Sequence, residues 1–225
     1  MHNIKKYKSL IFDCDGVILN SNKLKIEAFR KVLHKFNPLA VEELINYLKN
    51  NFGTSRYVLI DMFLKNIISK YEKNHLKQDE NIKKLIQNYS NECKKLLFKS
   101  EVAKDLKELR EVTSNIPWFI VSGGDQEELR EVFKYKKLYN YFNGGIYGSP
   151  KKKIDIIKYH IQKGIIKHPA LMIGDSKLDH LAAKYNQIDF IFASEWSCFR
   201  DYASYCKENS IKRINSISEI LNTFY

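Results

Sequence analysis

Short apolar stretches alternate with longer amphipathic ones along most of this chain. The apolar stretches have the length and composition of buried β-strands, and several of them end at glycine or acidic residues. The expected strands are residues 9–12, 116–121, 145–147, 170–173 and 189–193, and the expected helices between them are residues 101–112, 125–135, 151–163 and 177–186. Strands that alternate with helices in this way predict an α/β fold with a parallel, doubly wound sheet.

The alternation is interrupted between the first and second expected strands. This region has no strand pattern and reads instead as a series of amphipathic helices, with breaks at Asn37-Pro38 and at Phe52-Gly53-Thr54. The expected helices are residues 22–36, 39–50, 55–73 and 79–98. We therefore predict an all-helical cap, residues 21–99, inserted into a core domain formed by residues 1–20 and 100–225.

Composition supports a folded protein that does not span a membrane. Of the 225 residues 44% are hydrophobic and 28% are charged, which suits a packed core and argues against general disorder. No apolar run is long enough to cross a bilayer, and residues 1–6 lack the pattern of a signal peptide. The cysteines are scattered without a CxxC pair, as expected for reduced thiols. We expect a cytoplasmic protein.

The formal net charge of +12 raises the possibility of a nucleic-acid-binding module. Lysine is far more common than arginine among the basic residues, although arginine is the side chain that binds phosphates and base edges through two parallel hydrogen bonds. The lysines are also spread along the chain and form no single basic stripe. Attraction of a small anionic substrate explains the charge more simply, and nucleic-acid binding stays as an alternative.

The first candidate site follows the first expected strand, at residues 13–17. Two carboxylates in a tight loop, Asp13 and Asp15, can divide the work of attack or metal binding and of proton exchange, and Gly16 permits a sharp turn. An Asp-rich turn without a function would have the same sequence. An EF-hand loop is excluded, because its twelfth position would be Leu24 and a strand precedes it.

Two further candidate sites could hold a phosphate. Ser122 and Gly123 follow the second expected strand, where a hydroxyl and backbone amides can bind phosphate oxygens. The alternative is an ordinary helix N-cap formed by Ser122 or Asp125. A lysine at the start of the helix near residue 154 could neutralise phosphoryl charge, and the spacing favours Lys153 with Lys152 as the second choice. Its alternative is a solvated basic helix start.

The fourth candidate site follows the strand expected at residues 170–173. Asp175 and Asp179 lie four residues apart across a loop-to-helix junction, where they could hold a hard cation and position a lysine. Mg²⁺ suits a site in which carboxylate oxygens meet phosphates. Favourable acidic residues at a helix start would give the same string without any function.

In combination these sites resemble the haloacid dehalogenase superfamily of hydrolases, over nearly the whole chain. Motif one of that family, D-x-D-G-[VT], is matched by residues 13–17, and its strand-terminal Ser or Thr by Ser122. Its lysine is matched by Lys153, and its G-D-x-x-x-D motif by Asp175 and Asp179. The resemblance implies a Rossmann-like core, and the helical insertion resembles the C1-type cap of the family.

The resemblance implies that Asp13 attacks phosphorus to form an aspartyl-phosphate. Asp15 would protonate the leaving group and then activate the water that hydrolyses the intermediate. Mg²⁺ would be held by Asp13, the backbone carbonyl of Asp15, and Asp175. Positioning and charge neutralisation supply most of the catalysis in such transfers.

The remaining motif residues would bind the phosphoryl group. By the same resemblance, Ser122 and Lys153 contact its oxygens, while Asp179 orients the lysine or a metal-bound water. Gly123 stays a candidate for phosphate binding from its place after the second expected strand. Because dehalogenase members lack the second acid, Asp15 favours phosphoester cleavage. A phosphatase is the preferred interpretation, and a β-phosphoglucomutase-like phosphomutase is the nearest alternative.

The cap is expected to select the substrate, a small phosphorylated metabolite. Arg56 follows the break at residues 52–54, in a segment that resembles one facing the active site in related members, and could bind a second anionic group or a sugar hydroxyl. A surface arginine at a helix start is the alternative. A sugar or polyol phosphate is the favoured substrate, while the exact substrate and the oligomeric state stay open.

Overall fold

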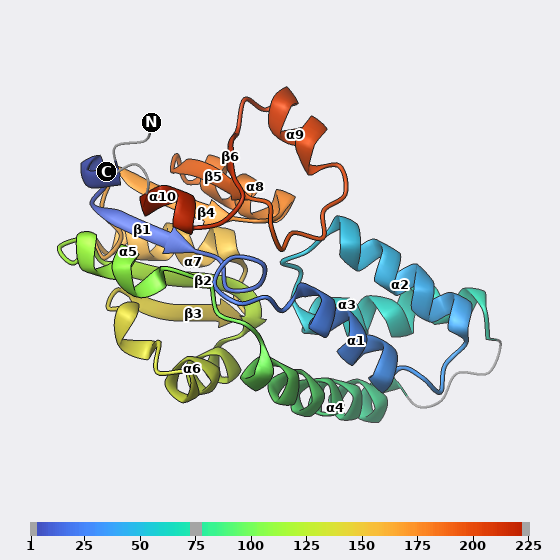
Figure 1. The fold of residues 1–225 in the computed structure, drawn as a ribbon. Coiled ribbons are helices and arrows are strands. Elements are labelled where there is room, and N and C mark those ends of the chain that lie inside the picture. Colours follow the sequence, from blue (N-terminus) through green and yellow to red (C-terminus); the bar gives the residue numbers. More distant parts are fainter. Residues whose placement is uncertain (1–3, 73–77, 222–225) are drawn as a thin grey trace.

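The centre of the fold is a six-stranded parallel sheet with the strand order β3-β2-β1-β4-β5-β6 (Figure 1). The computed structural model describes residues 4–72 and 78–221. The strands are β1 (Ser9–Phe12), β2 (Trp118–Asp125), β3 (Gly145–Ser149), β4 (Ala170–Gly174), β5 (Asp189–Ala193) and β6 (Lys212–Ile214). The sheet confirms the predicted α/β class and all five predicted strands.

Helices cover both faces of the sheet, as a doubly wound fold requires. On one face lie α5 (Leu106–Val112), α6 (Gln126–Tyr135) and α10 (Ser218–Leu221), and on the other lie α7 (Lys153–Gln162) and α8 (Lys177–Tyr185). Residues of β1 alternate between the two cores: Leu10 and Phe12 pack with the first set of helices, and Ile11 with the second. A strand buried on both faces explains why Ser9–Phe12 reads as a short apolar run.

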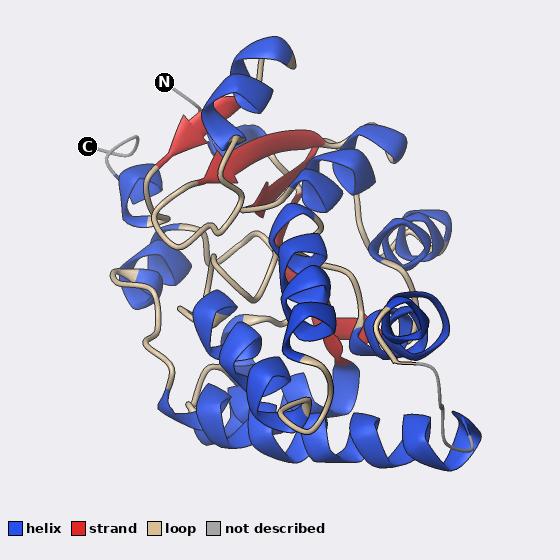
Figure 2. Cartoon of the chain, turned by 90° about the vertical axis from the view of Figure 1, so that its right-hand side faces the viewer, coloured by secondary structure: helices blue, strands red, loops and turns tan. Residues whose placement is uncertain are grey.

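Four of the other helices lie beyond the carboxyl ends of the strands. They are α1 (Asn22–Val32), α2 (Pro38–Asn50), α3 (Arg56–Met62) and α4 (Gln78–Lys99), and we call them, with their connections, the cap. Viewed from that side, the cap helices stand in front of the sheet (Figure 2). The break predicted at Asn37-Pro38 is the start of α2, where the Asn37 side chain accepts a hydrogen bond from the Leu39 amide.

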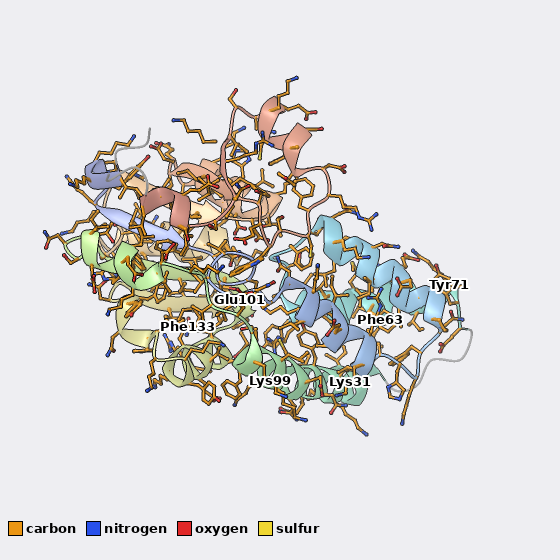
Figure 3. All side chains as sticks on the ribbon, in the orientation of Figure 1. Lys31, Phe63, Tyr71, Lys99, Glu101 and Phe133 are labelled. Carbon is orange, nitrogen blue, oxygen red and sulfur yellow. The ribbon has the colours of Figure 1, made fainter. Side chains whose placement is uncertain are left out.

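The predicted helix 55–73 is wrong in its second half. Helix α3 ends at Met62, and the chain continues as a π-helical turn over Phe63–Ile67 and a 3-10 turn over Ile68–Lys70, while residue 73 lies outside the described residues. The π-helical turn buries Phe63, Leu64 and Ile67, which also fit one face of an α-helix, so their spacing gave no sign of the change. Figure 3 shows Phe63 among the cap helices and Phe133 between α6 and the sheet.

Three C-terminal elements were not predicted from the sequence, namely β6, α9 (Tyr202–Glu208) and α10. Strand β6 lies at the sheet edge, and its Lys-Arg-Ile sequence is largely exposed, so it has no apolar run to reveal it. The helix expected over residues 101–112 begins only at Leu106, because Val102 instead forms a bridge with Leu19.

The proposed domain boundaries, 1–20 and 100–225 for the core and 21–99 for the cap, stay a prediction, and residues 1–3, 73–77 and 222–225 within them lie outside the described residues. Among the described helices, none has both the length and the apolar character needed to cross a membrane. The cytoplasmic location also stays a prediction.

Candidate active site

The loop after β1 places two carboxylates at the carboxyl edge of the sheet. Asp13 and Asp15 are both buried, and the Cys14 amide donates a 2.7 Å hydrogen bond to Asp13 Oδ1. Gly16 has a φ of +78°, and a Cβ there would lie 2.2 Å from Asp175 Oδ2. Glycine is therefore needed at this position, both for the left-handed backbone and for the close approach of Asp175.

A buried lysine joins the first and last motifs. Lys153 Nζ lies 2.8 Å from Asp13 Oδ2 and 2.5 Å from Asp179 Oδ1, whereas Lys152 is exposed. Burial by itself would lower the pKa of Lys153, but the two carboxylates outweigh it and hold that pKa above its usual value. The lysine is therefore a cation next to the candidate nucleophile.

Asp179 is held in place by the start of α8. Its Oδ2 accepts hydrogen bonds from the Ser176 hydroxyl at 2.6 Å and from the Ser176 amide at 3.1 Å, while Ser176 caps the helix in return. Asp179 therefore does stabilise the start of a helix, which was the alternative without a function. Its other oxygen, Oδ1, accepts a hydrogen bond from Lys153. One side chain both starts the helix and orients the lysine.

The carboxylates form a candidate metal site. Ligand oxygens of Asp13, Asp175 and Asp179 lie within 4.8 Å of one another. Burial, followed by the neighbouring carboxylates, raises the pKa of Asp13 to about 7 and that of Asp175 well above its usual value. A cation among these oxygens would relieve that crowding of negative charge.

Asn22 completes the polar surroundings of the candidate metal site. It donates a 2.6 Å hydrogen bond to Asp175 Oδ2, and its own carbonyl oxygen is buried with no partner among the described residues. A buried amide oxygen of this kind is a suitable acceptor for a metal or its water shell. The donor set, carboxylates and an amide oxygen, fits Mg²⁺.

Asp15 has different partners from Asp13. Its Oδ1 accepts a 2.6 Å hydrogen bond from the Ser21 hydroxyl, and its Oδ2 accepts one from Lys25 on α1 and a long one, 3.4 Å, from Ser122. Burial would raise the pKa of Asp15, but Lys25 and Ser21 outweigh it and the pKa is lowered. The surroundings therefore raise the pKa of Asp13 and lower the pKa of Asp15.

Ser21, Asn22 and Lys25 contact the candidate site but were not predicted from the sequence. Ser21 resembles the N-cap of α1, and Lys25 resembles any basic residue of an amphipathic helix. The sequence offered one indication, which is that all three residues follow within a few positions of the loop of residues 13–17. Their contacts with Asp15 and Asp175 depend on how α1 leaves the sheet.

The end of β2 supplies the candidate phosphate-binding loop. Ser122 is fully buried, and its hydroxyl accepts a 3.0 Å hydrogen bond from the Gly124 amide. The helix-cap role falls to Asp125, whose carboxylate accepts a hydrogen bond from the Glu128 amide at 3.1 Å. Ser122 is therefore not the cap of α6 and faces Asp15 across the carboxyl edge of the sheet.

Comparison with known proteins identifies the family. A family model described as haloacid dehalogenase-like hydrolase matches residues 10–193. The chain belongs to this family. The match includes all four motifs and the helical cap, so the resemblance inferred from residues 13–17, 122, 153, 175 and 179 is confirmed at the level of the family, and the chain is a hydrolase of this type.

Individual relatives are more distant. A curated protein of Clostridium perfringens, named "Putative pyrophosphatase PpaX", is 26% identical over 185 residues, 79% of each chain. A haloacid dehalogenase-like hydrolase from Streptococcus pneumoniae shares the fold with a TM-score of 0.67 and 21% identity over 99% of this chain and 100% of that one. A protein described as a predicted phosphoglycolate phosphatase from Haemophilus somnus gives a TM-score of 0.76 with 15% identity, over 99% and 100% of the two chains.

In this haloacid dehalogenase-like hydrolase, Arg56 reaches the site but is bound to the protein itself. Its guanidinium donates to both carboxylate oxygens of Glu128 on α6, at 2.8 and 2.6 Å, and to the Ser90 hydroxyl at 2.7 Å. Arg56 and Glu128 are both buried, so the pair links cap to core. Arg56 is therefore not the surface arginine that was the alternative, and its role in substrate binding stays a prediction.

Gly123 is the point at which the cap loop touches the phosphate-binding loop. A Cβ on Gly123 would lie 2.1 Å from the Gly53 carbonyl oxygen, which is backbone and cannot rotate away. We expect Gly123→Ala to displace the cap loop and to lower kcat/KM by about 10²-fold, the effect of a misplacement of about 1 Å. Steady-state kinetics on any hydrolysed phosphate ester would measure the loss.

Gly124→Ala is the matched control for that substitution. A Cβ on Gly124 would meet side chains instead of backbone, Leu129 at 3.3 Å and Lys25 Nζ at 3.4 Å, and both can shift by a few tenths of an ångström. Its loss of activity should be much smaller. Equal losses in the two variants would contradict the idea that the backbone contact with Gly53 matters.

Proposed function

We propose that the chain is a Mg²⁺-dependent phosphatase that hydrolyses a small phosphomonoester through an aspartyl-phosphate on Asp13. The observation that carries this proposal is the pair of buried acids after β1, one beside Lys153 and the other beside Ser122 and Lys25. A carboxylate beside a buried lysine suits a nucleophile, and a second carboxylate beside the candidate phosphate-binding serine lies where it can exchange a proton with the leaving group. Relatives named as a pyrophosphatase and a phosphoglycolate phosphatase support phosphoester chemistry.

The side chains suggest the following division of work. Asp13 attacks phosphorus, and Lys153, oriented by Asp179, neutralises charge on the phosphoryl oxygens. Ser122 and the backbone of Gly123 hold those oxygens in line with the nucleophile. Mg²⁺, held by Asp13, Asp175 and the backbone carbonyl of Asp15, would supply further neutralisation of phosphoryl charge.

Asp15 is the proposed acid and base. It gives a proton to the departing oxygen of the ester and then takes one from the water that cleaves the aspartyl-phosphate. The hydrogen bond from Ser21 fixes the orientation of its carboxyl group on the side away from Ser122. Burial of Asp13 under the cap keeps bulk water away from the reacting atoms.

The leaving group would lie under the cap. The cavity between Asp15 and the cap side chains measures about 30 Å³, room for about two water molecules. A sugar or polyol phosphate stays the sequence-based prediction, and a sugar would enter only after the cap moves away from the core. A small phosphorylated metabolite is the proposed partner.

A phosphate-release screen over sugar, polyol and nucleotide monophosphates with Mg²⁺ tests the proposal. We expect release from at least one small monoester by the wild type and none by Asp13→Asn. Absence of release from every ester would remove the phosphatase proposal. Conversion of a sugar 1-phosphate into its 6-phosphate isomer would favour the phosphomutase, and salt-sensitive binding of DNA or RNA without release would favour the nucleic-acid alternative.

Removal of the metal should abolish that activity. We expect EDTA to lower phosphate release by about 10²-fold or more, because the buried carboxylates would face the phosphate without a neutralising cation. Added Mg²⁺ in excess over EDTA should restore the rate. Full activity after dialysis against EDTA, with no response to Mg²⁺, would contradict the metal requirement.

A further inference from the structure

Lys25 is a cation on the cap side of the cavity with hydrogen-bonding capacity to spare. Its side chain is 13% exposed, and its ammonium donates to Asp15 Oδ2. An ideal Cβ on Gly124 would lie 3.4 Å from its Nζ, so the ammonium also lies over the loop that follows Ser122. An ammonium has three N–H donors, and Asp15 is the one partner that Lys25 has among the described residues.

The other cations around the cavity are already paired. Lys153 is held between Asp13 and Asp179, and Arg56 is held by both oxygens of Glu128 and by Ser90. In the part of the site that the structure describes, Lys25 is therefore the cation best able to accept a new anionic partner. Unpaired donors of a buried ammonium are costly, which favours a ligand that supplies acceptors.

Lys25 lies where it would contact the leaving group of the substrate and not the phosphoryl group that is transferred. The phosphoryl group would lie between Asp13, Ser122 and Lys153, and the bond that breaks would lie next to Asp15. Because Lys25 contacts Asp15 from the cap side, it is the first charged side chain that a leaving group would meet beyond the ester oxygen.

The rest of the cap wall offers few groups for a neutral sugar. It is largely apolar, and its apolar and aromatic members are Phe29, Leu48, Phe52, Leu59 and Tyr89. Such a wall lowers the local dielectric and strengthens attraction between Lys25 and an anion. A cavity of about 30 Å³ favours a small leaving group, because a larger one needs a larger movement of the cap.

We propose that Lys25 binds a second anionic group on the leaving group, so that the preferred substrate is a small phosphate ester or anhydride bearing a carboxylate or a second phosphate close to the scissile oxygen. The inference rests on the proposed phosphatase function and names its substrate class. Lys25 acts as a specificity-determining residue, and the anion it binds replaces or joins Asp15 as its partner.

Matched substrates test the inference. 2-Phosphoglycolate carries a carboxylate, pyrophosphate carries a second phosphate, and 2-hydroxyethyl phosphate has a neutral hydroxymethyl group where 2-phosphoglycolate has its carboxylate. We expect kcat/KM of the wild type to be about 10- to 100-fold higher for at least one of the anionic substrates than for the neutral ester, the range for a charge-assisted hydrogen bond. Which anionic substrate is preferred distinguishes the carboxylate from the phosphate.

The ratio of kcat/KM between anionic and neutral substrates is then compared among variants. Lys25→Met should lower it by about 10-fold or more, and Lys25→Arg should keep most of it. If the substitution also disturbs Asp15, kcat/KM falls for the anionic and the neutral substrates alike, and this common loss cancels in the ratio. Lys23→Met, an exposed position on the same helix, removes the same net charge and should leave the ratio unchanged.

Two results would overturn the inference while leaving the phosphatase proposal intact. One is a wild-type enzyme that hydrolyses the neutral ester as fast as both anionic substrates. The other is a ratio of kcat/KM between anionic and neutral substrates that is the same in Lys25→Met as in the wild type. If no phosphate is released from any ester in this set or in the broader screen, the proposed function fails, and this inference fails with it.

Discussion

Replacing Asp13 by asparagine is expected to reduce phosphate release by about 10⁴-fold or more, the scale seen when a covalent nucleophile is removed. The amide is nearly the same size as the carboxylate, so the hydrogen bond from the Cys14 amide can be kept. The attack on phosphorus is lost because the amide oxygen is a poor nucleophile. Phosphate release from a chromogenic ester such as p-nitrophenyl phosphate measures the change.

Asp15→Asn separates the two acids in the same assay. Because p-nitrophenolate leaves without a proton, this variant can still form the aspartyl-phosphate but should hydrolyse it slowly. Mass spectrometry of acid-quenched protein should then find a phosphoryl group on Asp13 in Asp15→Asn and none in Asp13→Asn. Phosphorylation at another residue, or near wild-type turnover by Asp13→Asn, would contradict the assignment of the nucleophile.

Breaking the buried pair between Arg56 and Glu128 is expected to destabilise the protein by about 3 to 5 kcal/mol. Arg56→Met leaves the Glu128 carboxylate buried without its two hydrogen bonds, and Glu128→Met leaves the guanidinium in the same position. Both residues are less than 10% exposed, so water cannot replace the lost partner without movement of the cap. Urea denaturation measures the free energy of unfolding of each variant.

The double variant and a surface pair provide the controls. Arg56→Met with Glu128→Met should recover much of the loss, because no buried charge is left unpaired. Arg30 and Glu42 form an ion pair of similar geometry on the surface of the cap, and Arg30→Met should cost no more than about 1 kcal/mol. Equal costs for Arg30→Met and Arg56→Met would show that burial does not strengthen the pair between cap and core.

The core of the fold was predictable because its signals are local. Strand β1 is a run of apolar residues with an abrupt polar end, and β4 repeats that pattern before Asp175. In a parallel sheet such ends meet at one edge, so order along the chain was enough to bring Asp13, Ser122 and Asp175 together. Edge strand β6 and the π-helical turn after Met62 lacked such signals and were missed.

The cap contacts could not be predicted in the same way. Lys25 and Arg56 occupy positions that any amphipathic helix could give to a solvated basic residue, and no periodic pattern marks either as buried. The partner of Arg56 lies 72 residues further along the chain, on the core helix α6. Lys25 meets Asp15 only because α1 turns back over the end of β1.

By itself the sequence determined the family, because the four groups of motif residues that carry the resemblance follow directly from strands whose apolar pattern and order place them at one edge. The tertiary structure alone decided which side chains of the cap face those groups. Pairing between Lys25 and Asp15, and between Arg56 and Glu128, results from packing the cap against the sheet. Such packing depends on the summed shape and charge of two surfaces and not on any local pattern in the chain.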